Sequence, residues 1–179
     1  MLRVALPLAV SLLFAAAPAQ AQTQAAIVLE PGDAYSFRVE TDGTMSAGPR
    51  ETADWAPIDV AAARHLSGLP IPERAVPYGT PLPDNGTIPA APPPRPGMIR
   101  VKFLSIAGRH SLLVVENGYD RAIVYRARMT RDGQTRPTDV CLIMPGQHGF
   151  EHWPHPIERL EISDVRFVPW REGDPQPCA

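Results

Sequence analysis

The stretch HGFEHWPHP, residues 148–156, gathers side chains that could do chemistry. His148, Glu151 and His152 follow the spacing H-x-x-E-H, and His155 comes three residues later. On a helix, residues four apart lie about one turn apart, so two imidazoles could bind one zinc ion while the glutamate activates its water. A zinc peptidase is therefore the first chemistry that this spacing suggests.

The residues around this stretch argue against the helix that such chemistry needs. Pro145 and Gly146 precede it, Gly149 lies inside it, and Pro154 and Pro156 close it. Proline and glycine both disfavour a helix interior, and fewer than ten residues remain. The sequence therefore argues against peptidase activity, and we assign no catalytic residues.

An extended chain would keep the two histidines apart. His148 and His152 would share a face at a separation of about 13 Å, too far for one ion bound through bonds of about 2 Å. Glu151 would point to the opposite face. We interpret the stretch as a structural corner between strands, at which Phe150 and Trp153 bury their rings.

A metal site remains the alternative interpretation, because a turn can bring together residues that an extended strand would keep apart. It could gather two of His148, His152 and His155 around copper or zinc. Cys141 and Met144 lie nearby in sequence and belong to the ligand types of copper sites. Apart from this copper or zinc alternative, we expect no cofactor.

The first 21 residues have the composition of an export signal. Arg3 provides the charged start, an apolar stretch follows, and Ala19 and Ala21 are small residues at the expected cleavage positions. The apolar stretch is shorter than the roughly 18 to 20 residues needed to span a bilayer. We expect a periplasmic or secreted protein whose mature chain has no transmembrane segment.

Export changes the interpretation of the two cysteines, because thiols in an oxidising compartment tend to pair. Cys141 and Cys178 are the only cysteines, so one intramolecular disulfide is possible. That bond would tether the proline-containing tail to the fold. A redox pair is the alternative, although the two are too distant in sequence for a C-x-x-C motif.

Arginines gather around one predicted hairpin. Arg126 and Arg128 would project from the same side of a strand, where two guanidinium groups could bind a carboxylate or sulfate. The alternative is a solvated sheet face whose arginines pair with acids such as Glu116, Asp120 and Asp132. The formal net charge of −2 gives no reason to expect nucleic acid as a partner.

The rest of the chain reads mainly as short strands separated by turns. Strands are predicted within residues 25–48, and further along at 98–106, 110–116, 121–129, 139–144 and 157–168, the last with a break near Ser163 and Asp164. Asn117-Gly118 and Asp132-Gly133 are typical hairpin turns. One short helix is predicted before Gly68, followed by a proline-rich irregular connector.

These elements predict an all-β protein, an immunoglobulin-like antiparallel β-sandwich of the Greek-key kind with at most one short helix. We divide the chain into a signal peptide (1–21), N-terminal strands (22–48), a short helix and proline-rich connector (49–97), and the main strands with a disulfide-tethered tail (98–179). All share one domain after the signal.

This class of fold hosts many unrelated functions, so activity must be argued from a site. We expect a non-enzymatic exported protein that acts through surface contacts as an accessory or binding protein for a partner protein or small ligand. The alternatives are a metal-binding periplasmic domain that uses residues 148–155 and, third, a hydrolase whose catalytic residues are dispersed in the sequence.

Overall fold

The computed structural model describes residues 22–69, 89–175 and 178. The predicted export signal (1–21) and residues 70–88 of the proline-rich connector lie outside the described residues. In the described part, no helix is long and apolar enough to cross a membrane.

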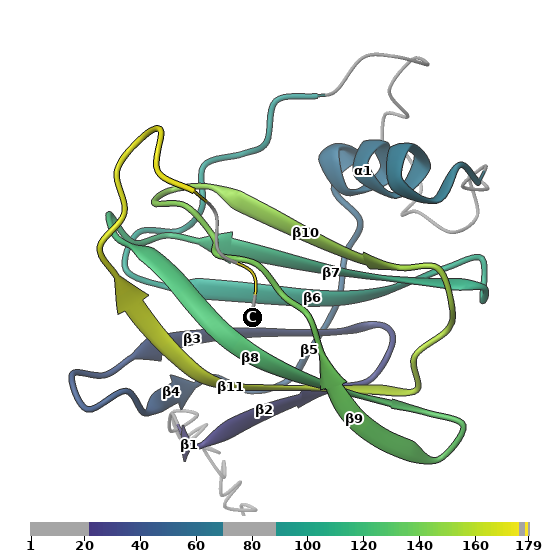
Figure 1. Cartoon of the computed structure of the whole chain (residues 1–179), viewed down its shortest axis with the longest axis horizontal. Coiled ribbons are helices and arrows are strands. Elements are labelled where there is room, and N and C mark those ends of the chain that lie inside the picture. Colours follow the sequence, from purple (N-terminus) through teal and green to yellow (C-terminus); the bar gives the residue numbers. More distant parts are fainter. Residues whose placement is uncertain (1–21, 70–88, 176–177, 179) are drawn as a thin grey trace, which may run out of the picture.

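Nearly all regular elements of the described chain are strands, and they form two antiparallel sheets (Figure 1). The first sheet has the order β1-β4-β3-β6-β7-β10, and β5 also pairs with β3. Its strands are β1 (Gln22–Gln24), β3 (Asp33–Val39), β4 (Met45–Ala47), β5 (Glu51–Thr52), β6 (Ile99–Ile106), β7 (His110–Asn117) and β10 (His148–Trp153). The second sheet has the order β2-β11-β8-β9. Its strands are β2 (Ala26–Leu29), β8 (Ala122–Arg131), β9 (Gln134–Thr138) and β11 (Arg159–Val168).

The two sheets share one apolar core. Alternate residues of the longer strands face it, as predicted for β8, where Ile123, Tyr125 and Ala127 are buried. Phe103 of the first sheet and Leu160 of the second belong to the same buried cluster. The predicted all-β, antiparallel class is therefore confirmed.

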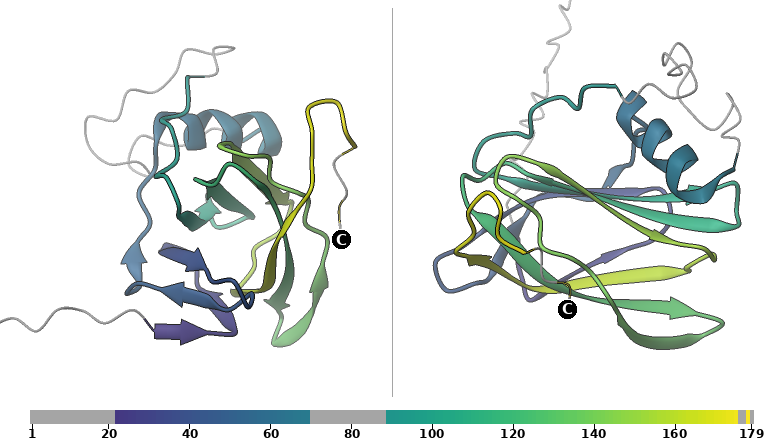
Figure 2. Two further views of the ribbon diagram at one scale, coloured as in Figure 1. Left: turned by 90° about the vertical axis from the view of Figure 1, so that its left-hand side faces the viewer. Right: turned by 45° about the horizontal axis from the view of Figure 1, so that its top comes forward.

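The short helix is also confirmed, as α1 (Pro57–Ser67). Pro57 occupies its first position, where the missing N–H is not needed, and Asp59 accepts a hydrogen bond from the Ala56 N–H at 2.8 Å. Gly68 ends the helix in the left-handed conformation, at φ 64°. α1 lies on the outer face of the first sheet, away from the second sheet (Figure 2).

A second, smaller apolar cluster joins α1 to that outer face. Val60 and Ala63 of the helix pack against Leu104 of β6 and against Leu112 and Val114 of β7. The first sheet is therefore buried on both sides where α1 covers it. This explains why β7 carries the continuous apolar run 112–115 rather than an alternating pattern.

The hairpin predicted at Asn117-Gly118 is wrong. This turn leads from β7 in the first sheet to β8 in the second, and the two strands do not pair. The Asn117 side-chain amide donates to the carbonyl oxygens of Arg121 and Met144, so it holds separate loops together. Gly118 is required for a different reason: a Cβ there would lie 1.8 Å from the Arg95 carbonyl oxygen.

The remaining differences and agreements concern single strands and turns. The strand predicted at 139–144 is wrong, because only isolated bridges form there, one of them between Ile143 and Ile123. β9 was not predicted, since its residues are polar and include Pro137. The turn at Asp132-Gly133 and the break in β11 after Ser163 are confirmed.

The histidine stretch is an edge strand, so its interpretation as a corner between strands is wrong. β10 pairs with β7 along its whole length, with His148 opposite Glu116 and Trp153 opposite Ser111. The flanking prolines end the strand rather than bending the chain within it. Because the segment is extended, His148 and His152 are too far apart to bind one metal ion together, as the strand geometry predicts.

Candidate functional site

A groove lies beside β10, between that strand and α1. We call it the helix–edge groove. It is lined by Ile58, Ala61, Ala62, His65 and Leu66 of α1, by residues 141–144, and by His148, Gly149, Phe150 and Glu151 of β10. Its volume is about 440 Å³. Ligand pockets commonly fall between about 300 and 1,000 Å³, so this space could hold one or two side chains or a small molecule.

Among the residues that the structure describes, no strand pairs with the main chain of β10 on the groove side. β10 is the last strand of the first sheet, and no other described strand pairs with its second edge. The Asn117 N–H donates to the Gln147 carbonyl at 2.9 Å, which makes these two a hydrogen-bonded pair. Because pairing alternates in an antiparallel ladder, the N–H and C=O groups of His148, Phe150 and His152 point away from β7.

Two elements flank this free edge. On the outer face, the Phe150 ring packs against the apolar cluster under α1. On the inner face, the Ile143 side chain lies so close to Gly149 that a Cβ there would be 2.1 Å from its Cδ1. Gly149 is therefore the residue that lets segment 141–144 approach β10 and form the second wall.

Glu151 places a carboxyl group between this wall and the core. Its Oε1 accepts a hydrogen bond from the Cys141 N–H at 2.6 Å. Burial raises the pKa of Glu151 above its usual 4.5, and the bond from Cys141 opposes that shift. Burial, reinforced by the nearby Glu151 charge, also raises the pKa of Tyr125 well above 10.0.

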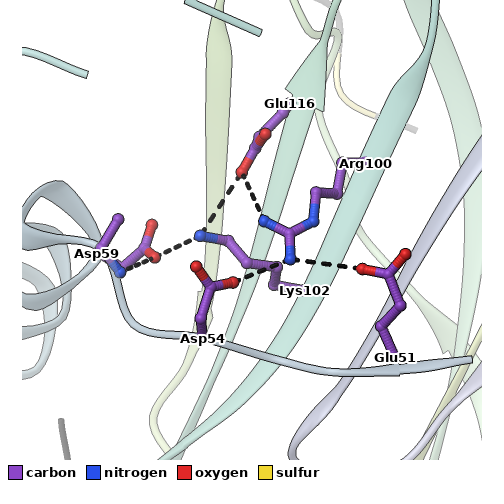
Figure 3. A network of polar contacts seen from close by, with 7 residues as sticks. Glu51, Asp54, Asp59, Arg100, Lys102 and Glu116 are labelled. Carbon is purple, nitrogen blue, oxygen red and sulfur yellow. Dashed lines mark hydrogen bonds and ion pairs between the residues drawn. The ribbon is translucent and has the colours of Figure 1, made fainter. Parts of the chain in front are cut away.

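A network of charged side chains holds α1 to the sheet (Figure 3). Lys102 of β6 is 2% exposed and its Nζ contacts Asp59, which is fully buried in the first turn of α1. Glu116 of β7 lies 3.5 Å from the same Nζ. Arg100 extends the network outward and lies 2.9 Å from Asp54.

This network determines where one wall of the groove lies. Burying two charges costs several kcal/mol unless each finds a close partner, so Asp59 and Lys102 are stable only when α1 sits over β6. The helix is thereby held at one position on the sheet. The network explains why Lys102, although buried, is not a packing defect.

The structure separates His148 from His152, two of the three histidines predicted as metal ligands. His148 and His152 lie on the same face of β10, four residues apart in an extended strand, as the spacing argument requires. His148 lines the groove, whereas the Nε2 atom of His152 lies 2.9 Å from Nδ1 of His110. Among the described residues, no group of three or more His, Cys, Asp or Glu side chains is placed to hold a metal ion.

The histidines are held toward their neutral forms. Burial lowers the pKa of His148 below its usual 6.5, although the carboxylates of Glu116 and Asp59 partly offset it. Burial also lowers the pKa of His152, and the charges of His110 and His155 lower it further. Neutral imidazoles can both accept and donate hydrogen bonds near neutral pH.

Phe150 and Trp153 both pack, but on opposite faces of β10. Trp153 is buried in the core between the sheets, and its indole N–H donates to Thr138 at 2.7 Å. Phe150 is partly buried under α1. The prediction that both rings are buried therefore holds in part, although they do not share a corner.

Arg126 and Arg128 lie on the exposed face of β8, as the alternation predicts. Of the acids suggested as partners for the arginines of this hairpin, Asp132 lies 3.2 Å from Arg131. Arg126 Nε instead lies 3.5 Å from Asp164 at the β11 bulge, an acid that was not suggested. Glu116 belongs to the first sheet and contacts Lys102 instead. Anion binding by the two arginines stays a prediction.

The Cys141 and Cys178 sulfurs lie 2.06 Å apart, at disulfide distance. The pair ties the C-terminal tail to the segment that forms the inner wall of the groove. The sequence analysis identified the pair but not its position beside Glu151.

Sequence reasoning missed the residues that build the groove and its support. Lys102 is the single lysine of the chain, and its place among the apolar residues of β6 was the available signal for a buried ion pair. Asp59 lies three residues after Ala56, at the position where an acidic side chain usually caps the start of a helix. No pattern in the sequence indicates that Asp59 lies close to Lys102, because 43 residues separate the two.

The chain was also compared with known proteins. No family model, no curated protein and no solved structure matches it. The function must therefore be argued from the groove, the unpaired strand and the side chains around them.

Proposed function

We propose that this chain is an exported, non-enzymatic binding protein that takes an extended peptide segment of a partner protein along β10. The observation that supports this best is the unpaired edge of β10 at the side of an apolar groove. Addition of a peptide strand to a sheet edge is a recurring mode of recognition, in which the main chain provides affinity and side-chain pockets provide specificity.

The main-chain contribution comes from His148, Phe150 and His152. Each directs an N–H and a C=O away from β7, and each hydrogen bond formed there contributes about 0.5–1.5 kcal/mol net. Exposed edges also tend to pair with other chains unless they are protected. An edge enclosed by a helix on one side and a loop on the other admits one extended strand and excludes a flat sheet.

The side-chain contribution comes from the groove. Side chains of an added strand would alternate between the α1 side and the side of segment 141–144. Ile58, Ala62 and Leu66 make the α1 side apolar, and Met144 adds an adaptable thioether. The expected partner segment therefore has apolar side chains at alternate positions and no charge facing α1.

The architectural class and the location belong to the same proposal. Two packed antiparallel sheets, with chain crossings from β2 to β3 and from β10 to β11, support an immunoglobulin-like Greek-key sandwich. The signal-like residues 1–21 and the cysteine pair support a periplasmic or secreted location.

Selection of peptides from a random displayed library, followed by calorimetry, tests the proposed binding. We expect selected peptides to bind the wild-type chain and to shift the amide resonances of His148, Phe150 and His152. His152→Pro removes one outward N–H and places a ring in the path of the added strand. This variant should weaken binding by about tenfold or more, a loss of about 1.4 kcal/mol.

His152→Ala is the matched control, because it loses the same imidazole but keeps the N–H. It should bind the selected peptides within about threefold of wild type, since no side-chain contact is required of His152. Equal losses in the two variants, or binding that leaves β10 resonances unmoved, would exclude strand addition at this edge.

A second candidate function is copper or zinc binding, which one observation favours. His110 and His152 bring two ring nitrogens within 2.9 Å, close to the separation of two ligands on one ion. This pair shares His152 with the predicted set of His148, His152 and His155, and adds His110 to it. Zinc titration by calorimetry tests it: binding at micromolar ion that His110→Ala abolishes would support this function, and no heat would dismiss it.

A further inference from the structure

Lys102 is the only lysine of the chain, and it lies beneath α1 with 2% of its side chain exposed. Its Nζ contacts Oδ2 of Asp59, whose side chain is fully buried. Oε1 of Glu116 lies 3.5 Å from the same Nζ. Figure 3 shows the amine between the two carboxyl groups. An amine, a carboxyl group and a second carboxyl group are thus collected from β6, α1 and β7.

Beneath α1 these groups adjoin a buried apolar cluster, and on the other side Glu116 lies 4.0 Å from Arg100. Val60 and Ala63 of α1, with Leu104 and Val114 of the sheet, are all buried next to them. A charged pair kept out of water carries a large desolvation cost, and the conversion of both charges into a neutral amide would remove it. The same burial excludes the water that would hydrolyse such a bond.

We propose that Lys102 and Asp59 form an intramolecular isopeptide bond, a covalent modification site that joins α1 to β6. The Lys102 ammonium gives a proton to Glu116, which passes it to the Asp59 carboxylate, and the freed amine then attacks Cγ of the protonated Asp59 side chain. A C–N bond forms and a C–O bond breaks. The second amine proton leaves with the hydroxyl group as water, and Glu116 relays it.

The reaction balances without any further reagent. One ammonium and one carboxylate become one amide and one water molecule, and no electrons are exchanged. Glu116 ends as it began. The step therefore needs only the three side chains and the folded protein that holds them.

The two carboxyl oxygens of Asp59 have different surroundings, which decide which of them stays in the amide and which leaves as water. Oδ2 accepts a hydrogen bond from the Ala56 N–H at 2.8 Å, which would stabilise negative charge on this oxygen during attack and then hold the amide carbonyl. Oδ1 is buried and has no hydrogen-bond partner among the described residues. Oδ1 is thus the oxygen that leaves as water.

Positioning supplies most of the acceleration. Lys102 is fixed by its strand and Asp59 by the first turn of α1. The amine and the carboxyl group are therefore already in contact, and no conformational entropy is lost in bringing them together. Well-oriented intramolecular partners behave as if present at effective concentrations of about 10⁵ M or more. The bond would keep α1, and with it one wall of the helix–edge groove, attached to the first sheet.

Intact-mass spectrometry of the purified, reduced full chain is the deciding experiment. We expect a mass lower by one water molecule than the sequence from its observed N-terminus. Trypsin should fail to cleave after Lys102 and should yield residues 101–109 joined to residues 51–64. An amine reagent applied to the denatured protein should label the N-terminus alone, because no other lysine exists.

Two variants complete the test. Lys102→Arg keeps the positive charge but cannot form this amide, so it should show the full sequence mass. Glu116→Gln should also show the full mass, because the proton acceptor is lost. A wild-type chain of full sequence mass, with cleavage after Lys102 and a labelled Lys102 amine, overturns the proposal whether or not either variant folds.

Discussion

Replacement of Lys102 by methionine tests the anchoring of α1 to the sheet. Methionine keeps most of the length and apolar stem of the side chain, so packing against the cluster under α1 changes little. What is lost is the amine that satisfies Asp59, whether the two are joined as an ion pair or as an amide. Asp59 then remains fully buried with an unpaired charge.

The expected cost follows from this burial. Removal of one partner from a buried pair typically destabilises a protein by about 3–5 kcal/mol. At about 2–4 °C per kcal/mol for a chain of this size, the melting temperature should fall by about 6–20 °C. Urea unfolding followed by circular dichroism measures the loss, because urea does not screen charges as a guanidinium salt does.

Arg126→Met is the control for the removal of one cation from a sheet. Arg126 and its partner Asp164 have side chains that are 71% and 58% exposed, so this change should cost less than about 1 kcal/mol. Lys102→Met combined with Asp59→Asn should recover part of the loss, since asparagine is neutral and still accepts from Ala56. If Lys102→Met costs no more than Arg126→Met, the anchoring argument is refuted.

Four further predictions concern other parts of the fold. The free energy of unfolding should fall as the pH drops below about 6.5, because the pKa of His148 is lowered in the folded chain and the unfolded chain binds a proton there first. In urea titrations between about pH 7 and pH 5, His148→Gln should make the free energy of unfolding depend less on pH. Cys141→Ser should cost about 4 kcal/mol, since Cys141 and Cys178 are 37 residues apart, and addition of a reductant to wild type should reproduce the loss. Gly118→Ala should cost at least about 2 kcal/mol, because its Cβ would lie 1.8 Å from a backbone carbonyl oxygen; a loss within error of zero in thermal unfolding would contradict the turn geometry. Tyr125→Phe should raise stability by about 1 kcal/mol, because the Tyr125 hydroxyl is buried with no hydrogen-bond partner among the described residues; a fall in melting temperature would show that the hydroxyl has one.

Local patterns predicted much of the secondary structure. Alternation of apolar and polar side chains placed β8 and its arginine face correctly, and Gly68 marked the end of α1. The same reasoning went wrong where a residue serves a distant contact. Asn117 has the sequence context of a hairpin turn, yet its side chain holds together loops that local pattern cannot relate.

The candidate site was predictable only in its parts. Prolines and glycines around residues 148–156 showed that no helix would bring His148 to His152, and this conclusion holds although the segment is a strand rather than a corner. That this strand is an edge, with an unpaired side facing a helix, depends on which strands lie next to it. Strand order is a long-range property, and periodicity within one segment carries no information about it.

The sequence by itself determined the class of structure, because side-chain alternation, turn residues and helix caps act over a few neighbouring positions. It also determined which cysteines could pair, since only two exist. The tertiary structure alone decided that Lys102 meets Asp59 across 43 residues, and that α1 stands beside the free edge of β10. Such meetings arise when whole elements pack so that their apolar faces are buried together, which is why they appear only in the folded chain.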